Sequence, residues 1–280
     1  MQSSLKLIRA VQLLPKRLYG SSSGSLVNLT VDDKTGYATM ELNRPPVNSL
    51  NLELLQSIDK SLDQLNENRT RGLILTSSSS SVFSAGLDIM EMYKPNVERA
   101  GQFWRTLQDV WMKLFGATYP TAAAINGHSP AGGCLLAMCC EYRVMLPKFT
   151  IGLNETRLGI VAPTWFQATM LNVLSRKEAE RALTLGTMFT TEEALKNGLV
   201  DETAASKQEA IEKCVAFLDQ FKKVSGEARA ITKQALRAEP IRVLDENRDQ
   251  DVDLFLFTIQ QKKVQKGLEA YLEALKKKSG

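Results

Sequence analysis

Histidine is almost absent from this chain, since only His128 among its 280 residues is a histidine. Nucleophilic catalysis of the Ser-His-Asp or Cys-His kind needs a histidine to carry the proton, so it would have to rely on this one residue. His128 follows Asn126-Gly127 in a turn, where a side chain that faces solvent is expected. The composition therefore argues against triad-type hydrolase chemistry.

Cysteine is scarce and lacks the spacing of a metal site. The four cysteines contain no C-x-x-C pair and have no histidine at ligand spacing, which makes a zinc site unexpected. We expect them to be small core residues in a reducing compartment. They are Cys134, Cys139, Cys140 and Cys214.

Long apolar runs are also missing. No run approaches the ~20 apolar residues of a membrane span, so no integral membrane segment is expected. With 44% apolar and 24% charged residues, the chain has the composition of one large or two modest globular domains.

Acidic residues are absent before Asp32, although four basic residues lie there. These four account for the entire formal net charge of +4, so the rest of the chain is balanced and a nucleic-acid partner is not expected. Residues 1–24 combine basic and apolar residues and end in Ser21-Ser22-Ser23-Gly24. This pattern is typical of a mitochondrial presequence and predicts the matrix as the location. The alternative is a disordered tail with charges placed by chance.

Hydrophobic periodicity predicts an α/β arrangement up to about residue 160. A hairpin is expected at 26–42, followed by a helix whose N-cap would be Asn48 or Ser49. Further elements are strands at 72–76, 122–125, 141–146 and 149–152, and helices at 52–65, 98–115 and 134–140.

After Pro163 the pattern is almost wholly helical. The predicted helices cover 165–174, 177–185, 191–196, 207–221, 227–236 and 252–277. We therefore divide the chain into the presequence, an α/β core at 25–205 and a helical region at 206–280.

Two adjacent glycines, Gly132 and Gly133, begin the apolar helix that follows the strand at 122–125. Each costs a helix about 1 kcal/mol relative to alanine. Glycines are useful where a ligand must approach the backbone, and a helix start presents free N–H groups to a negatively charged oxygen. The alternative is a turn that lets the helix pack closely against the strand.

Three stretches together resemble the crotonase (enoyl-CoA hydratase/isomerase) superfamily. They are F-S-A-G-L-D-I at 83–89, A-I-N-G-H-S-P-A-G-G-C at 124–134 and I-G-L-N-E-T-R-L-G-I at 151–160. Their order and spacing agree with the family from about residue 27 to 240. The resemblance implies a ββα spiral core with a C-terminal helical region that builds homotrimers.

The resemblance also implies site residues. The backbone N–H groups of Leu87 and Gly132 would form an oxyanion hole for the thioester oxygen of an acyl-CoA, and Asn154 would contact the substrate or the acid. Coenzyme A would be part of the substrate, with no other cofactor and no metal. The turn that would line its site consists of Ala85, Gly86, Leu87, Asp88 and Ile89. Asp88 is also expected to cap the following helix.

The catalytic acid would be Glu155. Hydratases of this family carry a second glutamate at the position of Leu135, and a leucine cannot orient or activate water. A single carboxylate can still move a proton from C2 to C4, with apolar neighbours such as Leu135 and Ile160 raising its pKa. The resemblance therefore implies the Δ3,Δ2-enoyl-CoA isomerase branch, in its mitochondrial form, acting on unsaturated fatty acids in β-oxidation. The alternatives are a hydratase-like enzyme and a catalytically silent acyl-CoA-binding protein.

Overall fold

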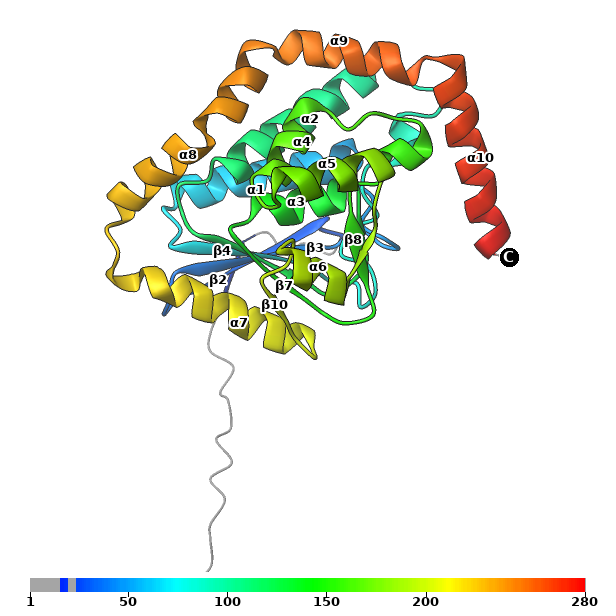
Figure 1. Ribbon diagram of the computed structural model, residues 1–280. Coiled ribbons are helices and arrows are strands. Elements are labelled where there is room, and N and C mark those ends of the chain that lie inside the picture. Colours follow the sequence, from blue (N-terminus) through cyan, green and yellow to red (C-terminus); the bar gives the residue numbers. More distant parts are fainter. Residues whose placement is uncertain (1–15, 20–23, 280) are drawn as a thin grey trace, which may run out of the picture.

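The computed structural model describes residues 16–19 and 24–279 (Figure 1). Most of the predicted presequence, residues 1–24, lies outside these ranges. Within it, the short strand β1 (Lys16–Tyr19) pairs antiparallel with β2 (Val27–Asp32). Removal of this segment stays a prediction.

The core is a seven-stranded sheet in the order β1-β2-β3-β4-β5-β7-β10. The first two pairings are antiparallel, and every pairing from β3 onward is parallel. All residues of β4 and β5 are buried, which explains why these strands are continuous apolar runs. The remaining strands of this sheet are β3 (Tyr37–Leu42), β4 (Gly72–Ser77), β5 (Thr121–Ile125), β7 (Tyr142–Met145) and β10 (Glu202–Thr203).

A three-stranded sheet connects two of the sequence motifs. It pairs β6 (Ser129–Pro130) with β8 (Thr150–Gly152) in parallel and β8 with β9 (Phe189–Thr190) antiparallel. The Ala131 N–H continues the pairing by donating to the Gly152 carbonyl at 2.8 Å. The Gly-Gly turn and the Asn154-Glu155 turn are thereby held side by side.

Helices cover both faces of the main sheet (Figure 1). On one face α7 packs against Ile74, Ala122 and Val144, and on the other the larger core includes side chains of α1, α2 and α3. The α-helices are α1 (Leu52–Glu67), α2 (Val97–Phe115), α3 (Gly132–Cys139), α4 (Thr164–Leu171), α5 (Arg176–Leu185), α6 (Thr191–Asn197), α7 (Lys207–Asp219), α8 (Gly226–Glu246), α9 (Arg248–Ile259) and α10 (Lys262–Ser279). Short 3₁₀ turns lie at η1 (Ile89–Glu91), η2 (Glu155–Leu158) and η3 (Gln220–Lys223). None of the helices within residues 24–279 combines the length and apolarity that crossing a bilayer requires.

Three details of the sequence prediction were wrong. The N-cap of α1 is Asn51, whose side chain accepts from the Leu54 N–H, and not Asn48 or Ser49. The helix predicted at 227–236 continues to Glu246 through Pro240, and the helix predicted at 252–277 is two helices, α9 and α10. Apolar periodicity missed these boundaries because it measures burial, and α8 buries few of its residues.

Buried charges attach α8 to the core. The Glu141 carboxylate pairs with Lys233 at 3.0 Å and also with Arg229. Further along the helix, Arg237 donates to the carbonyls of Phe115 and Cys139 at 2.8 and 2.9 Å. These carbonyls lie at the C-terminal ends of α2 and α3, where a cation is favourable.

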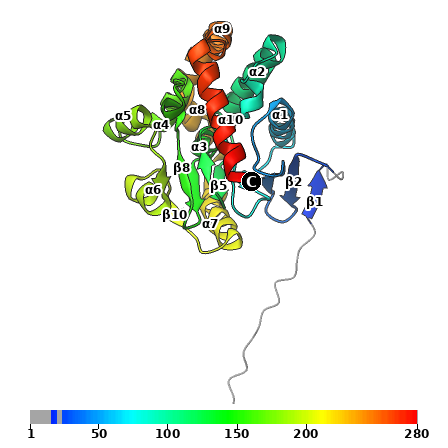
Figure 2. The ribbon, with the colours of Figure 1, turned by 90° about the vertical axis from the view of Figure 1, so that its right-hand side faces the viewer.

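From this attachment the chain continues over the core. Helix α9 lies against α2, and α10 then turns back beside η2 (Figures 1 and 2). The α9 contact is aromatic and polar: the Phe255 ring stacks on Trp104 at a centroid distance of 3.9 Å, and Asp251 accepts from the Trp104 indole N–H at 2.7 Å. Helix α9 is therefore held against α2 by ring stacking and by a hydrogen bond.

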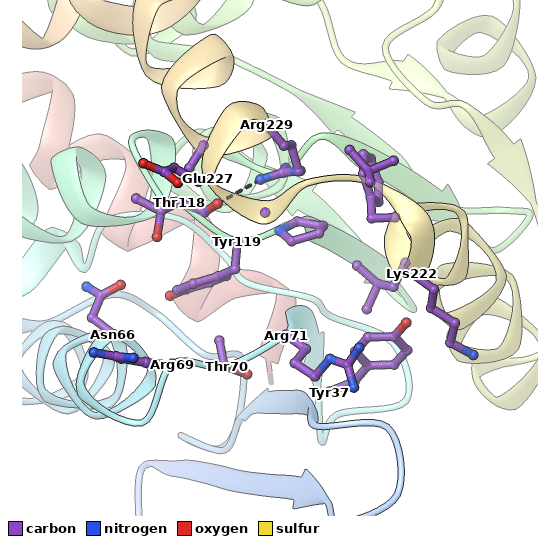
Figure 3. Close-up of a pocket in the computed structure, with 16 residues that line it drawn as sticks. Tyr37, Asn66, Arg69, Thr70, Arg71, Thr118, Tyr119, Lys222, Glu227 and Arg229 are labelled. Atoms are coloured by element: carbon purple, nitrogen blue, oxygen red, sulfur yellow. Dashed lines mark hydrogen bonds between the residues drawn. The ribbon is translucent and has the colours of Figure 1, made fainter.

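Because the strands from β3 onward are parallel, their carboxyl ends lie together at one end of the sheet and their amino ends at the other. Their carboxyl ends carry the loops at 77–88 and 126–131, which contain two of the motifs. Their amino ends, near Tyr37, Arg71 and Tyr119, border a cavity at the opposite end of the strands (Figure 3).

Candidate active site

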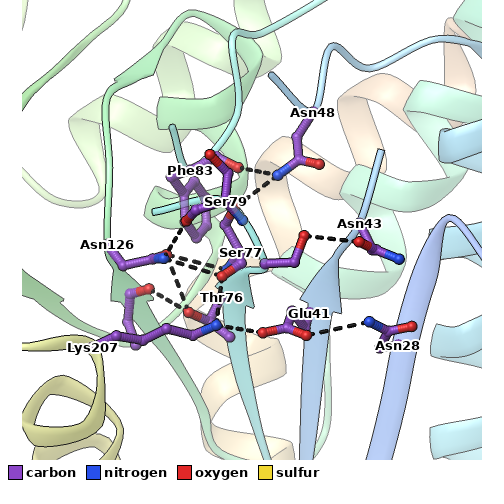
Figure 4. Close-up of polar contacts among 12 residues, drawn as sticks. Asn28, Glu41, Asn43, Asn48, Thr76, Ser77, Ser79, Phe83, Asn126 and Lys207 are labelled. Carbon is purple, nitrogen blue, oxygen red and sulfur yellow. Dashed lines mark hydrogen bonds and ion pairs between the residues drawn. The ribbon is translucent and has the colours of Figure 1, made fainter. Parts of the chain in front are cut away.

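The loops at the carboxyl ends of β4 and β5 are held by buried amide side chains (Figure 4). The Asn126 amide donates to the carbonyls of Ser77 and Ser79 at 3.1 and 2.7 Å, and its oxygen accepts from the Ser77 N–H at 3.2 Å. Asn48, with a φ of 50°, donates to Ser77 Oγ at 2.7 Å and to the Phe83 carbonyl at 3.1 Å. These bonds satisfy loop backbone groups that water cannot reach.

A lysine at the start of α7 supports the same edge of the sheet. Lys207 donates to the Ser77 carbonyl at 2.7 Å and forms an ion pair with Glu41 of β3 (Figure 4). The ends of β3 and β4 and the start of α7 are thereby tied together.

The two loops also touch backbone to backbone. A Cβ atom on Gly133 would lie 2.5 Å from the Ser84 carbonyl oxygen, and one on Gly127 would lie 2.3 Å from the Val82 nitrogen. Both distances are too short for any side chain, so glycine is required there. Gly133 is therefore required for close packing, but against the loop residue Ser84 and not against the preceding strand, as the alternative explanation had it.

Close packing also brings the two predicted oxyanion amides together. A Cβ atom on Gly132 would lie 3.4 Å from the Leu87 nitrogen, and one on Gly86 would lie 3.2 Å from the Gly132 nitrogen. Leu50 forms backbone hydrogen bonds with the two residues on either side of Leu87. The Leu50 N–H donates to the Gly86 carbonyl, and the Leu50 carbonyl accepts from the Asp88 N–H. In this pattern the Leu87 N–H points away from Leu50. Across residues 24–279, neither the Leu87 nor the Gly132 N–H has a hydrogen-bond acceptor.

The turn before α3 is strained. Ala131 has φ 48° and ψ −119°, a conformation that glycine adopts far more easily than alanine. Such a residue costs about 1–3 kcal/mol. The turn makes Gly132 the first residue of α3, so its free N–H points out of the helix start, where the helix dipole favours negative charge.

A cavity of about 370 Å³ is lined by Leu87 and by Ala131, the residue before Gly132. Its walls come from the loop at 85–89, the segment at 154–167 that includes η2 and the start of α4, Trp104 of α2, and the helices α9 and α10. Most of its lining side chains are apolar; they include Ile89, Met92, Trp104, Leu158, Ile160, Val161, Phe166, Leu254, Phe255 and Ile259. Such a space suits an acyl chain better than a polar ligand.

Glu155 contributes a carboxyl group to this cavity. Its side chain is buried, and across the described residues neither of its oxygens has a hydrogen-bond partner. Burial raises the pKa of Glu155 from its ordinary value of 4.5 to about 7. The neighbouring Asn154 oxygen lacks a partner in the same part of the chain. A buried carboxyl group without a partner among residues 24–279 is the kind of group that enzymes use for proton transfer.

The structure brings most of the predicted residues together. Ala85, Leu87, Ile89, Asn154 and Glu155 line the cavity. Gly86 and Gly132 form the backbone contact at its edge, as described above.

Asp88 and Leu135 lie elsewhere. The Asp88 side chain caps the 3₁₀ turn η1 by accepting from the Met90 N–H at 3.0 Å, whereas the following helix α2 is capped by Asn96; Asp88 also forms an ion pair with Arg44 at 3.0 Å. Leu135 is completely buried in the core and is not among the residues that line the cavity, because α3 is buried on all sides. Of the two apolar neighbours expected for Glu155, only Ile160 lines the cavity.

The contribution of α9 was not predicted. Leu254, Phe255 and Ile259 come from the far end of the chain, and Asp251 accepts hydrogen bonds from Trp104, Gln108 and Trp165. The only sequence signal was the aromatic character of Trp104 and Trp165, which indicates a core or a pocket wall without identifying the partner helix.

We predict that Glu155→Gln stabilises the protein at pH 8 but not at pH 4.5. Because the folded-state pKa is about 7 and the ordinary value is 4.5, the contribution of Glu155 to wild-type stability is highest below pH 4.5, falls as the pH rises to 7 and is constant above it. The effect of Glu155→Gln on the free energy of unfolding should therefore differ by about 3 kcal/mol between the two pH values. Urea unfolding at both pH values measures it, with the exposed Glu98→Gln as control. Equal effects of Glu155→Gln at the two pH values would contradict the prediction.

The comparisons with known proteins agree with this geometry. Residues 32–279 match the family described as Enoyl-CoA hydratase/isomerase. The chain is 44% identical to mouse "Enoyl-CoA delta isomerase 1, mitochondrial" over 91% of its length and 89% of that protein, and 40% identical to the human protein of the same name over 89% and 83%.

Two solved structures extend the comparison. The human mitochondrial delta3-delta2-enoyl-CoA isomerase superimposes with a TM-score of 0.88 at 39% identity, covering 91% of this chain and 100% of that one. An enoyl-CoA hydratase from Bacillus halodurans shares the fold, with a TM-score of 0.79 at 23% identity over 88% of this chain and 100% of that one. The predicted crotonase fold is confirmed, and the chain belongs to the enoyl-CoA hydratase/isomerase family.

Proposed function

We propose that this protein is a mitochondrial Δ3,Δ2-enoyl-CoA isomerase. It converts 3-cis- and 3-trans-enoyl-CoA to 2-trans-enoyl-CoA in the β-oxidation of unsaturated fatty acids. The observation that carries the proposal is one unpartnered carboxyl group, Glu155, in an apolar cavity beside two free backbone N–H groups. The relatives that are 40–44% identical and bear this isomerase name support it, as does their mitochondrial location.

The reaction follows from these groups. The C2 protons of a 3-enoyl thioester are acidified by the carbonyl group and by the double bond. Glu155 in its carboxylate form removes one of them, and the C2–H electron pair moves into a dienolate whose charge reaches the thioester oxygen. The N–H groups of Leu87 and Gly132 stabilise that oxygen, and one such donor is worth roughly 10²–10³ in rate. Glu155 then returns the proton at C4, leaving the double bond between C2 and C3.

The raised pKa of Glu155 suits both steps. A base with a pKa of about 7 is largely ionised at slightly alkaline pH and is stronger than an ordinary carboxylate. Once protonated, it is also an effective acid toward the dienolate. The apolar walls exclude water that would otherwise compete for the proton.

Hydration is less well supported. A hydratase of this family uses a second glutamate at the position of Leu135, which offers no carboxylate. The other acid in the cavity lining, Asp251, accepts hydrogen bonds from Trp104, Gln108 and Trp165 and is therefore occupied. The proposed reaction needs no metal and no cofactor other than the coenzyme A of the substrate.

We also propose that the protein assembles as a homotrimer. Large apolar side chains on the outer surface of α8 and α9 support self-association: Ile231 and Leu236 are 60% and 77% exposed, and Phe257 is 64% exposed. Apolar faces of this kind mark protein interfaces. Sedimentation equilibrium is expected to give three times the mass of one chain, and a monomer at micromolar concentration would contradict the proposal.

We predict that Glu155→Gln lowers the isomerase rate by at least 10²-fold, because general bases contribute about 10²–10⁴. Affinity for a saturated acyl-CoA should stay within a few-fold, since the amide keeps the size of the side chain. The rate is followed by the rise in absorbance of the conjugated thioester, with Glu98→Gln as the matched control.

Two outcomes would refute the isomerase assignment. If the wild-type protein and Glu155→Gln showed the same rate, only acyl-CoA binding would remain. If wild-type protein instead consumed 2-trans-enoyl-CoA by adding water, the hydratase alternative would be favoured.

The pH dependence of kcat/KM tests the role of Glu155 separately. Because the reacting form is the carboxylate, kcat/KM should fall tenfold per pH unit below about 7 and level off above it. A profile that stays flat down to pH 5 would show that the base has an ordinary carboxyl pKa.

A further inference from the structure

A second cavity, of about 650 Å³, lies at the amino ends of the sheet strands. It is bordered by Tyr37 at the start of β3, by Arg71 just before β4, and by Pro120 just before β5. Its other wall is formed by η3 and the first turn of α8. It shares no lining residue with the cavity that contains Glu155, which lies at the carboxyl ends of the same strands.

The lining of this cavity is strongly basic. It contains Arg69, Arg71, Lys222 and Arg229, against a single acid, Glu227. Lys222 is paired with Asp219 at 2.7 Å, but Arg69 and Arg71 are exposed and form no ion pair with any residue in 24–279. Two guanidinium groups are therefore free to bind an anion, and their planar fork suits a phosphate group.

Two buried donors in the same lining also lack acceptors. The Tyr119 side chain is 6% exposed, and its hydroxyl has no partner within the described residues. Burial raises the pKa of Tyr119, so the hydroxyl keeps its proton. The Arg229 side chain is 8% exposed; it bonds Glu141 and the Thr118 carbonyl through its terminal nitrogens, yet its Nε has no acceptor in that part of the chain.

Buried donors without acceptors are unfavourable unless a ligand satisfies them. The Arg229 Nε can only be satisfied by an acceptor atom, the Tyr119 hydroxyl can donate to one, and the surrounding charge favours acceptors on an anion. In Figure 3, Arg69 and Arg71 come from the loop before β4 and Arg229 comes from α8, with the Tyr119 ring in the space between these elements. Phosphate oxygens match this set of donors.

The volume and the aromatic lining indicate what else the ligand carries. The cavity is far larger than a phosphate ion requires, and its lining includes the aromatic side chains of Tyr37, Tyr119 and Phe221. Planar rings pack favourably against aromatic side chains. We propose that this cavity binds a small organic phosphate with an aromatic ring, of the nucleotide type, at a site separate from that of Glu155.

The test is calorimetric titration of the full chain with ADP. Arg71→Ala should weaken binding at this site at least tenfold, and Tyr119→Phe, which removes only the buried hydroxyl, about fivefold or more. Arg181→Ala, an exposed arginine on α5 outside both cavities, is the matched control, and Glu155→Gln reports on the other cavity. Both controls should bind ADP like the wild type.

The outcomes are distinct. Loss of one binding site in Arg71→Ala and weakening in Tyr119→Phe, with both controls unchanged, supports the proposal. Equal binding by all variants would place ADP elsewhere, for example where the coenzyme A portion of a substrate binds, and would overturn it. Absence of binding to wild type at millimolar ADP would also overturn it, as would inorganic phosphate that binds as tightly as ADP. None of these results depends on whether the protein is an isomerase.

Discussion

The backbone contact between the loops that follow β4 and β5 is the constraint on which the site depends. The Gly133 Cα lies so close to the Ser84 carbonyl that no side chain fits between them, and the same approach brings the Gly132 and Leu87 amides together. Parallel strand pairing places the two loops at one edge, and the buried amides of Asn48 and Asn126 fix their conformations. The proposed oxyanion site is therefore a result of main-chain packing, and side chains contribute by holding the loops.

Several unfavourable features are concentrated around this contact. Ala131 has a strained conformation, and in the part of the chain that the structure describes two backbone N–H groups have no acceptor and the buried Glu155 carboxyl group has no partner. Each lowers the stability of the free protein, and in the proposed mechanism the two N–H groups and the carboxyl group are used when a thioester binds. A sheet buried on both faces, with α7 on one side, supplies the stability that tolerates them.

Much of the fold could be predicted from the sequence, because periodicity reports burial directly. The hairpin, the buried strands β4 and β5 and the helices α1 and α2 follow from apolar spacing, and the three motifs identify Leu87, Gly132 and Glu155. The sequence could not show that Asn48 lies inside the protein, since a polar residue is buried only where specific partners exist. It also could not show that α9 forms a wall of the cavity, because contacts between distant segments leave no local pattern. The apolar surroundings of Glu155 likewise come from the 154–167 turn and α9 more than from Leu135.

The order in which the chain is synthesised has a consequence for the cavity wall. The amides and Glu155 belong to the first part of the protein, but Leu254, Phe255 and Ile259 belong to α9, and Asp251 fastens that helix to Trp104 and Trp165. A chain that has not yet extended beyond Arg248 has the groups of the proposed mechanism without the α9 side chains that enclose the cavity. The enclosed space is thus completed late in biosynthesis, and truncated translation products lack the apolar wall that would shield the proposed dienolate from water.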